Sequence, residues 1–198
     1  FGSLQARVVR VPQGLKLESG ALRGASFEAS GTGDWLVGPN GEETRVVLAT
    51  TTTDVQDTLT AWGFAPSLTG KNGRANAELR WSGGIDGDVF ARLNGKAKIA
   101  IEDGQLLNVQ PGAGRVLGLM SVGALPRRLT LDFTDLTDKG FAFDSITGDF
   151  DFRDGNAYTK NLLLKGPAAE IGIVGRTGLG ARDYEQTAMI TGHIGGSI

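Results

Sequence analysis

The chain has 198 residues, of which 40% are hydrophobic and 21% charged, with 20 Lys and Arg against 22 Asp and Glu. Both charge signs are interspersed without a basic block, which argues against a nucleic-acid partner because phosphate binding needs clustered cations. Without cysteine there are no disulfides, thiolate catalysis or zinc–thiolate sites, and no apolar run approaches the ~20 residues of a membrane-spanning helix.

Glycine is unusually frequent, with 31 residues, about twice the ~7% that is typical of proteins. Such glycines mark turns, bulges and bends when the intervening segments are strands. The first residue is Phe1, and no charged segment followed by an apolar one comes after it. We therefore expect any signal sequence or membrane anchor to lie outside this chain.

The first fifty residues already alternate in polarity, as when Arg45 and Val47 fall opposite Val46 and Leu48. A short helix is predicted next, over residues 54–62. Asp54 can cap its N-terminus, Asp57 stands at the capping-box position, and Gly63 can close its C-terminus.

Period-two alternation then dominates the chain, which predicts half-buried strands with one dry and one wet face. In the run 74–81 the polar residues alternate with Ala75, Ala77, Leu79 and Trp81. The same pattern occurs in the runs 96–101, 128–133, 149–153, 158–164 and 170–176.

Turn signals separate these runs at the spacing of hairpins. Parallel strands would need a helix between most pairs, and only two helical segments are predicted. The sequence therefore predicts a mainly β fold, a long twisted antiparallel sheet with two short helices. The predicted turns are Asp86-Gly87, Asn94-Gly95, Asp103-Gly104, Lys139-Gly140, Asp154-Gly155 and Gly166-Pro167.

The second predicted helix, over residues 113–124, lies between Pro111 and Pro126 and has Arg115 as its one charge. Because it lacks a polar face, it either caps the end of a groove, enters a membrane leaflet, or packs as a core helix across the sheet. Arg127 and Arg128 follow it, and they either contact anionic lipid head groups or simply open a strand. The apolar residues of this helix are Val116, Leu117, Leu119, Met120 and Val122.

The sequence offers weak signals for enzyme chemistry. The segment Gly112–Gly118 begins like a dinucleotide-binding loop, but Leu117 stands where the third glycine belongs, and Asp132 falls in an amphipathic run. His193 is the single histidine and has no nucleophile motif to serve. We therefore predict no catalytic residue, no metal and no cofactor. The acidic residues at 132, 135, 138, 149, 151 and 154 lack the EF-hand spacing and predict a solvated face.

Two stretches resemble proteins of the AsmA-like family of the YhdP type. The first is residues 59–81; the second and stronger is residues 104–192, where ALPRRLTLDF, KGFAFDSITGDF, AYTKNLLLKGPAAEI and GRTGL carry the likeness. The resemblance implies a large protein anchored in the inner membrane of a Gram-negative bacterium. Its periplasmic body would be a groove-shaped β-sheet that carries phospholipid towards the outer membrane. Envelope proteins would be further partners of this body.

Within that picture, residues 1–198 form a single groove segment near the C-terminal end of the body. Its dry face would shield acyl chains, each of which gains about 0.8 kcal/mol per CH₂ removed from water. Two alternatives stay open: the dry faces meet in a closed sandwich or barrel, or the chain is a structural or protein-docking module that conducts no lipid. The predicted lining residues are Leu79, Trp81, Ile99, Ile101, Leu129, Leu131, Phe133, Phe143, Phe150 and Phe152.

Overall fold

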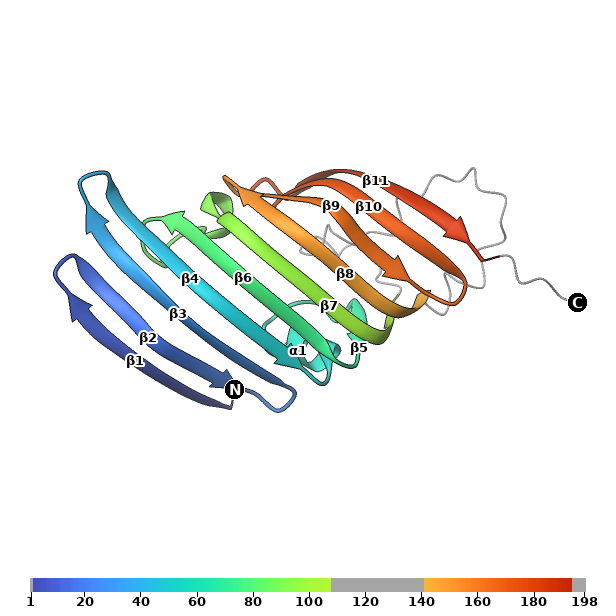
Figure 1. The fold of residues 1–198 in the computed structure, drawn as a ribbon, viewed down its shortest axis with the longest axis horizontal. Coiled ribbons are helices and arrows are strands. Elements are labelled where there is room, and N and C mark those ends of the chain that lie inside the picture. Colours follow the sequence, from blue (N-terminus) through green and yellow to red (C-terminus); the bar gives the residue numbers. More distant parts are fainter. Residues whose placement is uncertain (1, 108–140, 194–198) are drawn as a thin grey trace, which may run out of the picture.

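A computed structural model describes residues 2–107 and 141–193. These residues form one twisted antiparallel sheet with an order that follows the chain, β1-β2-β3-β4-β6-β7-β8-β9-β10-β11, and a short β5 paired to β7 (Figure 1). The strands are β1 (Ser3–Val11), β2 (Gly14–Arg23), β3 (Phe27–Gly38), β4 (Gly41–Thr52), β5 (Leu68–Gly70), β6 (Gly73–Ser82), β7 (Asn94–Leu106), β8 (Phe141–Arg153), β9 (Asn156–Lys165), β10 (Ala169–Gly178) and β11 (Asp183–Gly192).

The sheet is open, because β1 and β11 lie at opposite edges and do not pair with each other. This confirms the predicted mainly β, antiparallel fold for the residues described. It also contradicts the alternative in which the strands close into a barrel. One α-helix, α1 (Val55–Ala61), and one 3₁₀ turn, η1 (Phe90–Arg92), complete the described structure.

The predicted alternation matches the sides of the sheet in β6, whereas a register shift interrupts it in the run 158–164 on β9. In β6, Arg74, Asn76, Glu78 and Arg80 are exposed, whereas the residues between them are half-buried and Trp81 is buried. Two predicted turns also hold. Asp154 and Gly155 adopt φ values of 47° and 73°, as a tight hairpin between β8 and β9 requires, and Gly166-Pro167 joins β9 to β10.

Two other predicted turns are wrong, because Asn94-Gly95 and Asp103-Gly104 lie inside β7. Gly95 pairs with Leu79 on one side and Phe152 on the other. Asp103 has a φ of 48° at an irregularity in the ladder. Gly95 also has a positive φ, of 130°. A hairpin turn needs a residue that tolerates positive φ, and so do these two places inside a strand, so the same dipeptides mark both.

α1 begins and ends as the sequence predicts. The Asp54 carboxylate accepts a hydrogen bond from the Asp57 N–H at 3.0 Å. The reciprocal half of the capping box is not formed, because the Asp54 N–H donates to the Thr52 hydroxyl instead, at 3.0 Å. At the other end Gly63, with a φ of 83°, and Phe64 return hydrogen bonds to the last turn, which is a Schellman closure.

The second predicted helix, over residues 113–124, lies outside the described residues, with Val116, Leu117, Leu119, Met120 and Val122. The same applies to the predicted strand 128–133, to the predicted turn at Lys139-Gly140, and to Gly112, Arg127, Asp132, Asp135 and Asp138.

Candidate functional site

The pairing register puts most apolar side chains of the ten long strands on one side of the sheet. Ile99, for example, pairs with Ala75 on β6 and Gly148 on β8, and Ile101 pairs with Gly73 and Ile146. We call this side the apolar face. Its members include Leu4, Ala6, Val8, Leu15, Leu17, Gly20, Leu22, Phe27, Ala29, Gly31, Gly33, Trp35, Val37, Thr44, Val46, Leu48, Gly73, Ala75, Ala77, Leu79, Trp81, Gly95, Ala97, Ile99, Ile101, Leu106, Phe141, Phe143, Ile146, Gly148, Phe150, Phe152, Ala157, Leu162, Leu164, Ala169, Ile171, Ile173, Tyr184, Ala188 and Ile190.

Seven of the ten predicted lining residues lie on this face: Leu79, Trp81, Ile99, Ile101, Phe143, Phe150 and Phe152. Leu129, Leu131 and Phe133 lie outside the described residues.

The sequence prediction missed the members of the face on the first four strands. On β2 the alternation is interrupted by a one-residue bulge at 18–19, where two residues of β2 stand opposite one residue of β3. Leu15 and Leu17 therefore share a side with Gly20 and Leu22. A strict period of two therefore assigns the two halves of β2 to opposite faces.

Solvent exposure divides the apolar face into two parts. On β1 to β4 several large side chains are open to solvent: Leu4 is 72% exposed, Val8 54% and Leu48 39%, whereas Phe27 is buried. On β8 to β10 such side chains are buried, with Ile146 at 0% and Phe150 at 5%. We call the exposed and half-buried residues of β1 to β7 on this face the open part, and the residues of β8 to β10 on this face the closed part.

The closed part belongs to a single hydrophobic cluster. Ile146 lies at its centre, and Ile99 and Ile101 of β7 pack against it. The buried members are Val55, Leu68, Leu106, Phe143, Ile146, Phe150, Ala157, Leu162, Leu164 and Ile171.

α1 lies against the apolar face where β3, β6 and β7 meet one end of the sheet. Val55 belongs to the buried cluster, and its Cγ2 is only 3.0 Å from the point that a Cβ on Gly73 would occupy. The Trp62 ring, just after the helix, meets Phe27 edge-on at a centroid distance of 5.5 Å. The helix therefore bounds the apolar face at that end of the strands.

The loop 83–93 bounds the face at the other end of the strands. The Trp81 indole donates to the Gly84 carbonyl at 2.7 Å, and the Thr44 hydroxyl donates to the Gly83 carbonyl at 2.6 Å. The Arg92 guanidinium donates to the Asp86 carbonyl at 2.6 Å and holds the loop in shape. Beyond it, Leu93 is buried.

The opposite side of the sheet, which we call the polar face, carries charges in cross-strand pairs. Lys98 lies 3.5 Å from Asp149, and Arg176 lies 2.9 Å from Asp183. A hydrogen bond from Asn161 lowers the pKa of Asp149, with a smaller contribution from Lys98. These pairs keep the polar face solvated, as the sequence predicts for its acidic residues.

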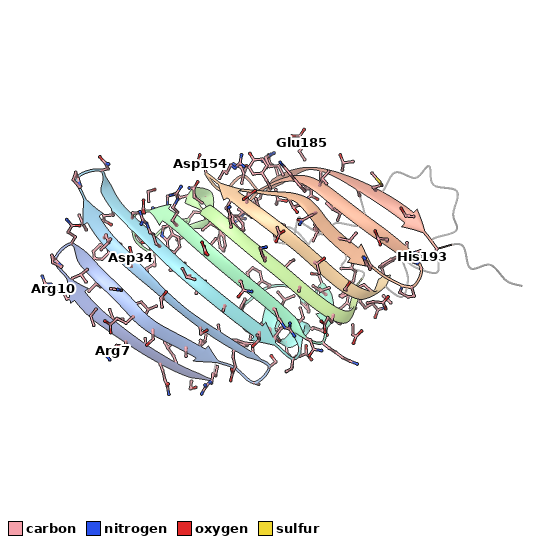
Figure 2. All side chains as sticks on the ribbon, in the orientation of Figure 1. Arg7, Arg10, Asp34, Asp154, Glu185 and His193 are labelled. Atoms are coloured by element: carbon pink, nitrogen blue, oxygen red, sulfur yellow. The ribbon has the colours of Figure 1, made fainter. Side chains whose placement is uncertain are left out.

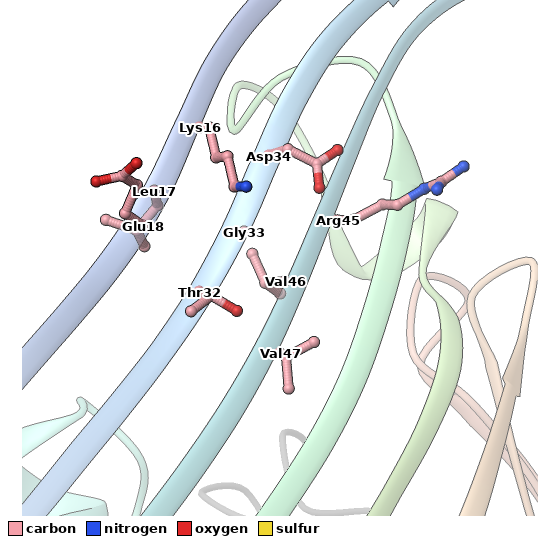
Figure 3. Close-up of a pocket in the computed structure, with 9 residues that line it drawn as sticks. All are labelled: Lys16, Leu17, Glu18, Thr32, Gly33, Asp34, Arg45, Val46 and Val47. Atoms are coloured by element: carbon pink, nitrogen blue, oxygen red, sulfur yellow. The ribbon is translucent and has the colours of Figure 1, made fainter. Parts of the chain in front are cut away.

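A shallow hollow crosses β2, β3 and β4 on the polar face (Figure 3). Lys16, Asp34 and Arg45 stand in register across the three strands beside it. Valines line the hollow as well, but an acyl chain there would take these charged groups out of water, so the apolar face is the better candidate for an apolar ligand.

The described residues bring no catalytic group together. His193 lies at the end of β11 with its Nδ1 3.2 Å from the Pro167 carbonyl oxygen, whereas Asp154 and Glu185 lie at the other end of the strands (Figure 2). Within residues 2–107 and 141–193 there is no group of three side chains that could hold a metal ion. The helices described there are too short to cross a membrane.

Comparison with known proteins gives two matches. A family model described as YhdP protein matches residues 1–198. The intermembrane phospholipid transporter YhdP of Escherichia coli (strain K12) is 26% identical over 199 residues, an alignment that covers 100% of this chain and 16% of that protein. No solved structure matches significantly.

Proposed function

Because the chain belongs to the YhdP family, we propose that it carries phospholipid acyl chains along its apolar face, as one segment of a longer protein that moves lipid between two membranes. The relative's name supplies the substrate class. The exposed apolar face supports this location for the acyl chains, since proteins rarely leave a contiguous apolar patch of this extent open without a use for it.

The geometry supports a non-enzymatic role. Along the open part, each methylene that leaves water contributes about 0.8 kcal/mol, and a few such contacts offset the cost of ordering a chain. The polar head group can stay in water beyond the face, so that the sheet need not bury a charge. We place this segment in the periplasm, between an inner-membrane anchor elsewhere in the protein and the outer membrane.

A matched pair of neighbouring residues tests the proposal. Leu48 is 39% exposed on the apolar face, and Val47 is 52% exposed on the polar face. We expect Leu48→Asp to lower bound phospholipid about tenfold, which corresponds to roughly 1.4 kcal/mol, because a carboxylate would have to lose water beside the acyl chain. Val47→Asp should leave bound lipid unchanged.

The measurement is native mass spectrometry with lipid extraction, on protein purified gently from bacterial membranes. Circular dichroism checks that both variants fold. The control is demanding, because Val47 pairs with Glu78 and a carboxylate at position 47 is repelled by it. Val47→Asp therefore also lowers stability somewhat, and a loss of lipid in Leu48→Asp alone is not explained by stability. If the parent protein carries no phospholipid, or if both variants lose it equally, the lipid path does not follow this face. A structural or protein-docking role then takes its place.

A further inference from the structure

We infer that acyl chains travel across the strands from β1 to β7 and that the path ends at the boundary between β7 and β8. This inference rests on the proposed function. It adds where on the face the lipid lies and which residues end its path.

The register defines three rows of residues that run across the open part, perpendicular to the strands. The middle row is composed almost entirely of small residues, and larger side chains stand in the rows on either side. The middle row is Ala6, Gly20, Gly31, Leu48, Ala77 and Ala97; its neighbours are Leu4, Leu22, Ala29, Thr50, Ala75 and Ile99, and Val8, Leu17, Gly33, Val46, Leu79 and Gly95.

All three rows close at β8. Ala97, the last residue of the middle row, pairs with Phe150, and Gly95 pairs with Phe152. In the third row Ile99 pairs with Gly148, and that position is filled from β9, because Leu162 Cδ1 lies 2.9 Å from where a Gly148 Cβ would be. Two aromatic rings and a leucine therefore stand where the rows would continue.

Within the three rows burial changes at the same line, because no row member on β1 to β7 is fully buried. Leu48 is open to solvent, whereas Phe150 is 5% exposed and Leu162 is 2% exposed. Side chains that already pack against one another offer no surface to a ligand, because the apolar atoms there have been removed from water and nothing more is gained. The closed part thus contributes stability, and the open part is left to bind lipid.

The length of the open part suits an acyl chain. Six strands from β1 to β7 along the sheet, at ~4.8 Å between neighbours, give a path of about 24 Å. One leaflet of a bilayer is about half of the ~30 Å hydrocarbon core. One extended acyl chain, about as long as a leaflet is thick, can therefore lie in the path.

Alanines of the apolar face allow a test, because they occur on both sides of the boundary. A photo-crosslinking amino acid would replace Ala6, Ala77 or Ala97 in the open part, or Ala188 on β11, one at a time in the full-length protein in Gram-negative cells. Ala188 is exposed, so neither folding nor access would prevent its reaction. A probe at Asn76, on the polar face beside Ala77, gives the background.

We expect phospholipid adducts at Ala6, Ala77 and Ala97 to exceed those at Ala188 and Asn76 at least tenfold. Adducts at Ala188 as abundant as at Ala77 would overturn the boundary while leaving lipid transport standing. Adducts at Ala6 alone would also overturn it, because the path would end before β6. If the phospholipid adducts at every position are only as abundant as those at Asn76, the proposed function is wrong, and the inference is wrong with it.

Discussion

Single glycines decide how closely neighbouring strands and rings can approach. At Gly104 a Cβ would overlap the Thr69 carbonyl oxygen and the Phe143 ring, one of the most buried aromatic rings of the core. We expect Gly104→Ala to destabilise the protein by about 2 kcal/mol, because a buried core cannot absorb an extra methyl without shifting. Thermal or urea unfolding measures the difference.

The control is Gly172, also within a strand, where a Cβ would meet nothing within 4 Å. Gly172→Ala should be neutral or should stabilise by up to about 1 kcal/mol, since it lowers the entropy of the unfolded chain. Equal losses at Gly104 and Gly172 would show that the close approach at Gly104 does not govern stability.

The Arg176–Asp183 pair on the polar face makes the stability of the folded protein depend on pH. Arg176 donates hydrogen bonds to both carboxylate oxygens of Asp183, at 2.9 and 3.1 Å, and lowers its pKa. A lowered carboxyl pKa stabilises the folded state above the unfolded value of about 3.9. That stability is lost as pH falls further, through the folded value.

Asp183→Asn should therefore be slightly less stable than the parent protein at pH 6 and should become equal to it in strong acid. The effect is small because the pair is partly exposed. Urea unfolding at several pH values tests this, and a stability difference that stays constant from pH 6 to pH 2 would contradict it.

At the scale of elements, α1 depends on its N-cap. The Asp54 carboxylate accepts a hydrogen bond from the Asp57 N–H, and the Thr58 hydroxyl donates one to the Asp54 carbonyl at 2.8 Å. We expect Asp54→Ala to cost about 1 kcal/mol and to raise hydrogen exchange within residues 55–61. Asp57→Ala should have a smaller effect, because its side chain does not complete the capping box. Equal exchange rates in the two variants would argue against the cap.

Regular strands were predictable because alternation is local to the sequence. The run 74–81 is flanked by no bulge, and each of its residues lies on the predicted side. Prediction failed where the period changes. The extra residue at 18–19 brings the apolar residues of both halves of β2 to one face, although a period of two separates them. Asp103-Gly104 was predicted as a hairpin turn, but it lies inside β7 with a positive φ at Asp103.

The bounds of the face were beyond sequence reasoning for a different reason. The caps of α1 are local signals and were predicted, but its position over Gly73 depends on contacts between elements. The loop 83–93 contains Asp86-Gly87 and was predicted as a turn, yet its hydrogen bonds to Trp81 and Thr44 follow from the folded sheet. Local patterns therefore identify the face, while packing decides which part of it stays open.

At the scale of the whole molecule, the sheet both exposes apolar surface and stays folded, although exposed apolar surface usually lowers stability. A single layer of strands exposes apolar surface and is only marginally stable. Here the cluster around Ile146 is buried on β8 to β10, while β1 to β4 leave Leu4 and Val8 open. The buried end can anchor the open end because every neighbouring pair of long strands from β1 to β11 is joined by a ladder of hydrogen bonds.

A path that crosses the strands is serial, so a block at any one strand should slow the whole flow. Ala77 lies in the middle row of the open part, and Asn76 lies beside it on the polar face, exposed to solvent. We expect Ala77→Trp to lower lipid transport strongly, though not completely, in cells that depend on the full-length protein. Asn76→Trp, which adds the same bulk on the other side, should leave transport intact.

Serial order also predicts how two blocks combine. Ala6 occupies the same row on β1, and Ala6→Trp should reduce transport by itself. Independent sites lose function additively, whereas two obstacles in one path do not. The double variant should therefore be no worse than the more severe single variant. Additive losses in a transport or growth assay, with normal protein levels, would show that lipids cross the sheet by more than one path.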